Sequence, residues 1–364
     1  VVAGANDVTL NDAGNNFGTV AITSAGVATI NDTNAVILGA SGVTTLNVTA
    51  AGNITNSGAL VVSGVTTVVA GANDVTLNDA GNNFGTVAIT SAGVATINDT
   101  NAVILGASGV TTLNVTAAGN ITNSGALVVS GTTTVVAGAN DVTLNNAGND
   151  FGIVVITTGK DILLTDINAI DLGASTVTGT YGVTSGTGAI TQSGALTVDA
   201  AATFTATGQN VTLANVANDF KAGVAVAGAN VSLIDANSID LAASTVTGTY
   251  SVTAANGNIT NSGDLGIAMA STFITTVSGS NISLNSSGNA FADSVTLQAV
   301  AGAGTFGDIT FVDSGAIDFK AAAAADGDLF INAATDGVVG GSLSVSAAAG
   351  NITQTIAIGA GTTS

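Results

Sequence analysis

The chain consists of tandem repeats, and their length and fidelity restrict its fold more than any other feature. Residues 1–64 recur without a change as residues 68–131, and a third copy begins at Val135. Because such repeats bury their apolar side chains against their neighbours, we expect one continuous structure over residues 1–364. We divide it into long repeats 1–67, 68–134, 135–203, 204–272 and 273–364, the last with one extra short unit. One Phe marks each repeat at a nearly constant spacing: Phe17, Phe84, Phe151, Phe220 and Phe291.

Within each repeat, short runs of alternating apolar and polar residues are separated by Gly, Asn and Asp, which favour turns. This alternation predicts short β-strands with one buried face. No run has the length of a helix, and the alanines at 321–325 are too few to form one. We expect Thr9, Ala21 and Ile37 to point outward, and ten other side chains of the first repeat to point inward: Val8, Leu10, Val20, Ile22, Val36, Leu38, Leu46, Val48, Ile54 and Leu60.

The repeat length selects one fold class among the all-β architectures. A β-sandwich domain needs about 100 residues and a bulky core, and the aromatic signatures of propeller blades are absent. A repeat of this size instead divides into three units of about 22 residues, each with two or three strands. We therefore predict an all-β, parallel β-solenoid (β-helix) of about 16 coils with about 22 residues per coil.

Composition excludes several classes of function. The chain has no Cys, His, Pro or Trp, its 23 acidic residues are all Asp, and its cations are Lys160, Lys221 and Lys320. Without His or Cys it lacks an imidazole base and a thiolate nucleophile, so we expect no enzyme. A net charge of −20 without Arg argues against nucleic-acid binding. No apolar run is long enough for a membrane-spanning helix, so we expect none.

Several motifs are similar to those of a known family of repetitive proteins. NDVTLNDAGNNFG, NAIDLGASTVTGTYGVTS, GAITQSGALTV and GNITNSGAL resemble the repeats of filamentous-haemagglutinin-like exoproteins, large bacterial surface proteins of two-partner secretion systems. The resemblance covers essentially the whole chain. It implies a right-handed β-helix, export across an outer membrane, and roles in adhesion, aggregation or biofilm matrix. The amino-terminal secretion domain that defines the family does not lie in this stretch.

Aspartates in one register are the candidate polar sites. Asp32, Asp99, Asp166, Asp235 and Asp313 each lie near Asn or Gly in a turn. We expect them to cap these turns by accepting hydrogen bonds from their own backbone two residues on. Calcium binding is the alternative, because carboxylate and amide oxygens suit this ion. The calcium-roll motif is absent, as is Glu. We therefore predict no specific metal ligands, only weak calcium binding through the dispersed carboxylates.

A local carboxylate cluster is the candidate catalytic site. Asp161, Asp166 and Asp171 lie close together in the sequence, as do Asp235 with Asp240 and Asp313 with Asp318. Glycoside hydrolysis needs two carboxylates. Yet Asp171 takes the register position of Ile37, which indicates an outward, solvated site. We therefore predict no catalytic and no cofactor-binding residue.

Two further side-chain series bear on function. We expect the Phe series to fill the core at a wide corner rather than to stack on a ligand. Thr-rich stretches such as Thr176 to Thr180 resemble the flat Thr arrays of ice-binding solenoids. We expect Thr pairs once in three coils, too rarely for such an array.

These features favour a structural protein. We expect the adhesive shaft of a long extracellular bacterial surface fibre or matrix filament, because identical copies present length and a repeated surface rather than a unique catalytic centre. A glycan- or calcium-binding solenoid module of a surface adhesin is the alternative. Neither end of the chain carries a charged or Pro-bearing cap. We therefore expect self-association into fibres, or a segment of a longer array.

Overall fold

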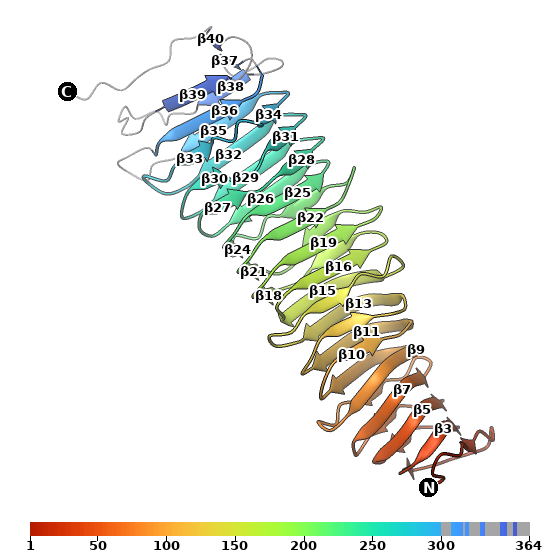
Figure 1. Ribbon diagram of the computed structural model, residues 1–364. Coiled ribbons are helices and arrows are strands. Elements are labelled where there is room, and N and C mark those ends of the chain that lie inside the picture. The colour runs from red at the N-terminus through yellow and green to blue at the C-terminus, as the bar shows by residue number, and fades with distance from the viewer. Residues whose placement is uncertain (300–306, 316, 320–327, 332–342, 348–351, 355–364) are drawn as a thin grey trace. The chain divides into compact units, whose positions relative to one another are not determined.

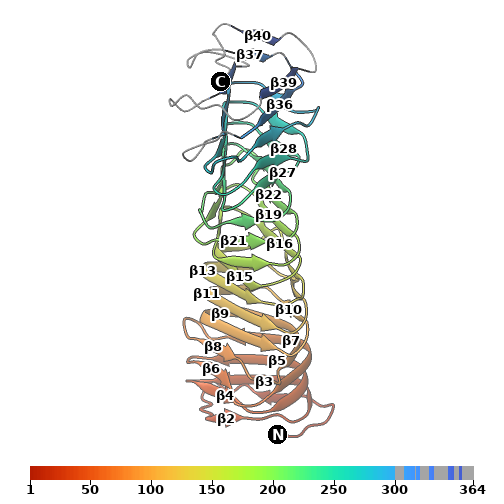
Figure 2. The same cartoon turned by 90° about the vertical axis from the view of Figure 1, so that its left-hand side faces the viewer.

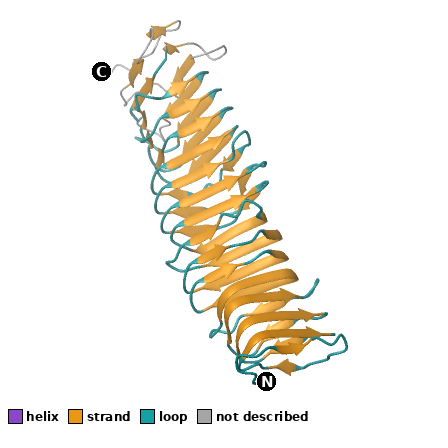
Figure 3. Cartoon of the chain, turned by 45° about the vertical axis from the view of Figure 1, so that its right-hand side comes forward, coloured by secondary structure: helices purple, strands orange, loops and turns teal. Residues whose placement is uncertain are grey.

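The computed structural model is an all-β, parallel β-solenoid of about 15 turns with about 20 residues per turn. It describes residues 1–299, 307–315, 317–319, 328–331, 343–347 and 352–354, among which there is no helix (Figure 3). The predicted fold class is confirmed, although the turns are slightly shorter than expected. The alanines at 321–325 and most of the extra unit expected in repeat 273–364 lie outside the described residues.

The chain divides into two compact units, Val1–Thr178 and Gly179–Ser364, which we call unit 1 and unit 2. In unit 1, strands of successive turns follow one another in two sheets (Figure 1). The first sheet contains β1 (Val8–Leu10), β3 (Ala25–Asp32), β5 (Ser41–Ala50), β7 (Leu60–Val69), the first part of β9 (Asn83–Asp99), β10 (Val103–Leu105), β12 (Ile121–Asn123), β14 (Val142–Leu144) and β16 (Ile162–Asp166).

The second sheet of unit 1 runs beside the first and closes each turn. It contains β2 (Thr19–Val20), β4 (Val36–Leu38), β6 (Ile54–Asn56), β8 (Val75–Leu77), the second part of β9, β11 (Ser108–Ala117), β13 (Leu127–Val136), β15 (Asp150–Thr158) and β17 (Ile170–Leu172). The short β18 (Ser175–Val177) joins the unit through a bridge from Val177 to Gly159. Figure 2 shows β4, β6 and β8 on one side of the unit and β5, β7 and β10 on the other.

Residues that pair between successive turns show the length of each turn directly. Val8 pairs with Ala28, and Ala28 pairs with Leu46 one turn later. Further along the same sheet Thr66 pairs with Val87. The sequence numbers of these partners differ by close to the average of about 20 residues per turn. Each such step between paired parallel strands rises by about 4.8 Å.

The long repeat does not contain a whole number of turns. Val8–Leu10 lies in the first sheet, whereas its identical copy Val75–Leu77 lies in the second and Val142–Leu144 lies in the first again. From β1 to β14 the first sheet advances by seven turns over two repeats, through β3, β5, β7, β9, β10 and β12. Each of these long repeats therefore spans three and a half turns. The expectation of three coils per repeat is wrong, because the corners are tighter and the turns shorter than expected.

The half turn places two blocks of long strands on different sheets. In the first sheet β3, β5, β7 and β9 have 8, 10, 10 and 17 residues. The first part of β9 pairs with β7, whereas its second part pairs with β8 and β11 in the second sheet. There β11, β13 and β15 continue the equivalent block with 10, 10 and 9 residues. Each sheet of unit 1 thus contains one block of long strands.

The core of unit 1 lies between its two sheets and follows the predicted alternation. Nine of the ten side chains expected to point inward are buried, and Ile37 remains 39% exposed, as does its copy Ile104 at 40%. Leu10 is only half-buried, because β1 pairs on one side only, with β3. Thr9 and Ala21 are exposed as predicted.

Unit 2 also consists of stacked parallel turns, and two of its sheets repeat the alternation. One contains β19 (Tyr181–Ser185), β22 (Ala202–Thr205), β25 (Val224–Gly228), β27 (Ile239–Leu241), β28 (Ser244–Val246), β30 (Ile259–Asn261), β31 (Leu265–Ile267), β33 (Ile282–Leu284), β34 (Ala290–Phe291), β36 (Ile309–Asp313) and β39 (Leu343–Ala347). The other contains β20 (Ile190–Gln192), β23 (Val211–Leu213), β26 (Val231–Asp235), β29 (Tyr250–Ala254), β32 (Ser271–Thr275), β35 (Val295–Ala299), β37 (Ile317–Phe319), β38 (Asp328–Ile331) and β40 (Ile352–Gln354).

Larger turns distinguish unit 2. Ser271 pairs with Val295, a longer step along the chain than those in the first sheet of unit 1, and β21 (Leu196–Val198) pairs with β24 (Asp219–Phe220) on a third side. The wider core is filled by aromatic rings: Phe273 makes edge contacts with Tyr250 and Phe291 at centroid distances of 5.7 and 6.1 Å. The core-filling interpretation of the Phe series is confirmed, since Phe84, Phe151, Phe220 and Phe291 are buried and Phe17, near the first turn, is half-buried.

Candidate functional site

The polar side chains gather at the corners, where the chain leaves one sheet and enters the next. Backbone N–H groups at a corner cannot all join the strand ladders, so they need other acceptors. Three sets of Asp and Asn side chains supply them: buried aspartates, buried asparagines and a surface series of both. These corners are the candidate functional site, because they hold most of the carboxylates that could act on a ligand.

Each buried corner aspartate uses both of its oxygens. In Asp99, Oδ2 accepts a hydrogen bond from the Phe84 N–H at 2.7 Å, and Oδ1 accepts one from the Asn101 N–H at 2.8 Å. Its side chain is only 7% exposed. The bond two residues along the chain is the predicted turn cap, whereas the bond to Phe84 joins it to the preceding turn. The same pair of bonds is made by Asp32, Asp166 and Asp235.

Burial changes the acidity of this set. It raises the pKa of Asp99, Asp166 and Asp313, and the backbone hydrogen bonds only partly oppose this effect. The pKa of Asp235 rises to about 6, because its burial outweighs the bonds from Phe220 and Asn237. A carboxylate whose oxygens are enclosed and already bonded to N–H groups is poorly placed to bind calcium. The turn-cap interpretation is therefore confirmed for this register.

The buried asparagines form a second set, which the sequence analysis missed. Asn82 is fully buried, and its Oδ1 accepts hydrogen bonds from the Leu60 N–H at 2.9 Å and the Asn56 Nδ2 at 2.8 Å. Its copy Asn149 is held in the same way by Leu127 and Asn123. The signal was the Asn two residues before each Phe, but an Asn inside a Gly- and Asn-rich turn is usually exposed. Only the stacking of turns reveals that it is enclosed.

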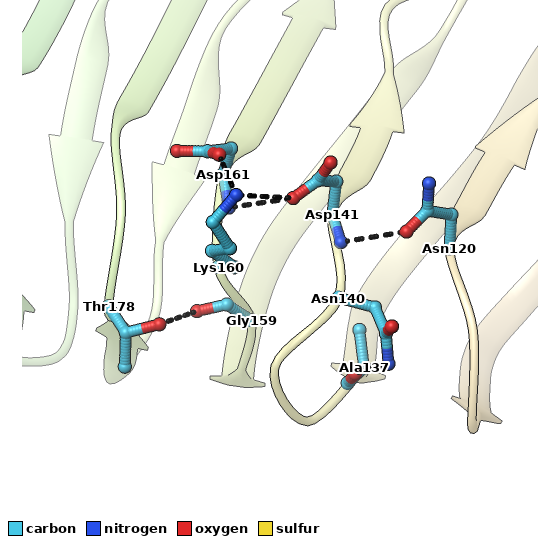
Figure 4. Close-up of polar contacts among 8 residues, drawn as sticks. All are labelled: Asn120, Ala137, Asn140, Asp141, Gly159, Lys160, Asp161 and Thr178. Carbon is cyan, nitrogen blue, oxygen red and sulfur yellow. Dashed lines mark hydrogen bonds and ion pairs between the residues drawn. The ribbon is translucent and has the colours of Figure 1, made fainter.

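The surface series forms a ladder along one corner (Figure 4). The Oδ1 atom of Asn120 accepts a hydrogen bond from the Asp141 N–H at 3.1 Å, and Asp141 Oδ1 accepts one from the Asp161 N–H at 3.4 Å. Each side chain thus bonds to the backbone of the next turn. In the preceding copy Asn53 bonds to the Asp74 N–H in the same way, at 3.1 Å. An Asp or Asn side chain therefore links neighbouring turns both at this corner and at the equivalent corner of the preceding copy, which leads into the other sheet.

Lys160 lies against this ladder and neutralises part of its charge. Its Nζ atom is 2.9 Å from Asp161 Oδ2 and 3.8 Å from Asp141 Oδ1 (Figure 4). The hydrogen bond and charge of Asp161, together with the charge of Asp141, raise the pKa of Lys160. Lys221 is placed similarly in unit 2, between Asp199 and Asp219. The side chains of these lysines are half exposed, so the pairs contribute little to stability.

The structure does not assemble the candidate catalytic cluster. Asp161 lies on the surface beside Lys160, Asp166 is a buried corner cap, and Asp171 points outward in β17, where it pairs with Ile153. The outward placement of Asp171 agrees with the comparison to Ile37. Within the described residues no group of three or more metal-ligating side chains occurs. Asp240 accepts hydrogen bonds from the hydroxyls of Thr260 and Ser262, and the Asp318 side chain lies outside the described residues.

Single threonines recur in one outward column of the first sheet. The central outward column of the first sheet runs through Thr9, Thr29, Asn47, Thr67 and Ala88. These single threonines, distant in the repeat, meet in one column when the short turns stack, and the expectation of Thr pairs once in three coils stays a prediction. Asn and Ala interrupt the column, so it is not a uniform Thr array.

Comparison with known proteins identifies a repeat family. The family described as "Repeats of unknown function (DUF5649)" matches residues 1–24, 25–91, 92–158, 159–227 and 228–298. The four complete repeats after the first match have the same lengths as the intervals between successive members of the Phe series. No curated protein and no solved structure matches the chain. In the part of the chain that the structure describes, no helix has the length and apolarity needed to cross a membrane.

Proposed function

The chain belongs to the DUF5649 repeat family, and we propose that it is a structural and adhesive shaft of a long extracellular bacterial surface fibre or matrix filament, without catalysis. The observation that carries this proposal is the stacking of identical sequence on itself. Copies 1–64 and 68–131 share every residue, and their strands pair with the turns before and after them. Such a design adds length and repeated surface with each copy.

The use of the corner side chains supports a structural role. The carboxylates of Asp99 and Asp166 accept two backbone hydrogen bonds each, and the amide of Asn82 joins two turns. A group engaged in this way holds turns together, and its burial keeps it from contacting a substrate. These side chains recur in every copy, as expected for parts of a scaffold.

The extracellular bacterial location rests on the motif resemblance. NDVTLNDAGNNFG and GNITNSGAL are similar to repeats of filamentous-haemagglutinin-like exoproteins, whose roles are adhesion, aggregation or matrix formation. The net charge of −20 with 48 Gly and no Cys is compatible with an exported, disulfide-free repeat protein.

A glycan- or calcium-binding module of a surface adhesin is the second candidate. It is favoured by the surface series, in which Asp74 lies at the corner before β8 of the second sheet and Asp141 at the corner before β14 of the first. Asp74 is exposed and Asp141 is half-buried, so cations can reach both. Divalent ions would screen these charges diffusely rather than occupy a closed coordination shell.

Binding and length measurements separate the two candidates. For the shaft we expect no specific signal of the whole chain on a glycan array, with or without calcium. We also expect arrays with added copies of repeat 68–134 to lengthen by about 17 Å per copy in electron micrographs, at about 4.8 Å per turn. Calcium-dependent binding to one glycan class, abolished by Asp74→Asn and Asp141→Asn, would instead establish the binding module.

A further inference from the structure

The half-turn register gives unit 1 two chemically matched faces. Face 1 is the outward surface of β3, β5, β7 and the first part of β9, centred on the paired column Thr29, Asn47, Thr67 and Ala88. Face 2 is the outward surface of the second part of β9, β11, β13 and β15, centred on Thr96, Asn114, Thr134 and Val155. Three of the four central residues are identical between the faces. Because the faces belong to different sheets, they lie on the two sides of the core.

Charge is confined to the edges of these faces. In strands β1 to β14, all of which the structure describes, no outward residue is charged. The carboxylates of Asp32 and Asp99 end β3 and β9, but they point inward and are buried. Other acids of this stretch, such as Asp74 and Asp79, lie in the corners, and Asp150 begins β15 at the edge of face 2. Both faces therefore present uncharged Thr, Asn and Val side chains bordered by negative charge.

We propose that faces 1 and 2 are docking surfaces for a second copy of this chain, so that copies associate side by side. The inference rests on the proposed structural role and names the surface through which that role is exercised. Each copy has a face on both sides of its core, so one copy can bind two neighbours. Association can therefore continue from copy to copy instead of ending at a dimer.

The equal spacing of the side-chain rows on two copies favours a second copy as the occupant, and charge determines which surfaces can meet. Two chains that each carry a net charge of −20 repel one another wherever their acidic corners meet. Only the uncharged faces allow close approach, and there the facing rows of side chains have the same spacing of about 4.8 Å. The methyl groups of Thr67 and of Val65, which is 42% exposed, give such a contact an apolar component. The faces offer a sugar ligand no aromatic stacking platform, since Phe84 and Phe151 are buried.

The area of a face predicts a weak individual contact. Four strands at about 4.8 Å and eight to ten residues at about 3.3 Å give about 500–600 Å². A stable interface usually buries about 800 Å² on each partner. One pair of faces therefore binds weakly, and tight lateral association requires several faces in one array. Screening of the acidic corners should strengthen this binding as the salt concentration rises.

A charge-swap experiment on the full chain tests the proposal. Thr67→Asp with Thr134→Asp adds one charge to the centre of each face, and Thr67→Lys with Thr134→Lys adds the opposite charge. The matched control is Asn16→Asp with Asn146→Asp, two corner positions at which another copy has Asp150 and Asp79. Sedimentation velocity at increasing protein concentration measures association, and circular dichroism confirms that each variant is folded.

The expected pattern involves all four proteins. Wild type and corner control should associate equally, whereas each face variant alone should need at least a tenfold higher concentration. A 1:1 mixture of the Asp and Lys variants should associate again, a result that misfolded variants cannot produce. A wild type that stays monomeric at millimolar concentration, face variants that associate like wild type, or a mixture no better than its components would overturn the inference. None of these outcomes affects the shaft proposal, which is tested by glycan binding and length.

Discussion

Replacing one buried corner aspartate should loosen two successive turns at once. Asp99→Ala removes the acceptors of the Phe84 N–H at 2.7 Å and of the Asn101 N–H at 2.8 Å. Hydrogen bonds to a charged acceptor contribute about 1.5–3 kcal/mol each, and the cost of burying the carboxylate, seen in its raised pKa, offsets part of their sum. We expect the free energy of local opening to fall by about 2–4 kcal/mol. This difference corresponds to about 30- to 800-fold faster amide hydrogen exchange at Phe84 and Asn101.

A matched substitution isolates the role of burial. Asp79 is only partly buried, at the preceding corner, and its Oδ1 accepts a single hydrogen bond, from the Gly81 N–H at 2.8 Å. Asp79→Ala removes the same charge as Asp99→Ala, yet it should change the exchange of Phe84 less than threefold. Hydrogen-exchange mass spectrometry on peptides that contain Phe84 measures both effects. Equal exchange rates in the two variants would refute the assignment of Asp99 as the bond between turns.

Three further outcomes follow from burial and charge. Leu105→Ala, at a side chain 1% exposed, should destabilise unit 1 by about 2–5 kcal/mol in urea unfolding, whereas Ile104→Ala, 40% exposed, should cost less than about 1 kcal/mol. Burial raises the folded-state pKa of Asp235 to about 6, so its contribution to stability is complete below about pH 4 and is lost as the pH rises through 6. The melting temperature should therefore be higher at pH 5 than at pH 7. This difference in melting temperature should be smaller in Asp235→Ala. Lys160→Ala removes only solvent-screened ion pairs, so the urea midpoint of unfolding should not change measurably.

The alternation of side chains could be predicted from the sequence because each strand obeys a period of two. Val36, Ile37 and Leu38 show this directly, since the first and third are buried and the second is exposed. The same argument predicts the outward position of Asp171, which lies between the buried Ile170 and Leu172. The fold class followed from the same pattern, since a short repeat with small side chains can be buried only by its own neighbours.

The half turn and the buried asparagines could not be predicted in the same way. The spacing of identical copies fixes the length of the repeat but not the number of residues at each corner, and a small difference in turn length changes three coils into three and a half. The environment of Asn82 depends on Asn56, which lies in the preceding copy and meets it only after the turns have stacked. Contacts between turns therefore determine the number of turns per repeat and the burial of these asparagines, and the local sequence pattern does not.

The central claim, that each of the first two repeats spans three and a half turns, can be measured with spin labels. The chain has no Cys, so Thr9→Cys, Thr76→Cys and Thr143→Cys can be labelled in pairs at equivalent positions of three copies. Positions 9 and 143 should lie on one sheet, seven turns and about 34 Å apart. Positions 9 and 76 should lie on opposite sheets, separated by about 17 Å along the stack and about 10 Å across it, with their labels pointing apart. Double electron–electron resonance should therefore give more than about 20 Å for this pair. A distance of about 14 Å, no more than half that between positions 9 and 143, would mean three whole turns per repeat and would contradict the account.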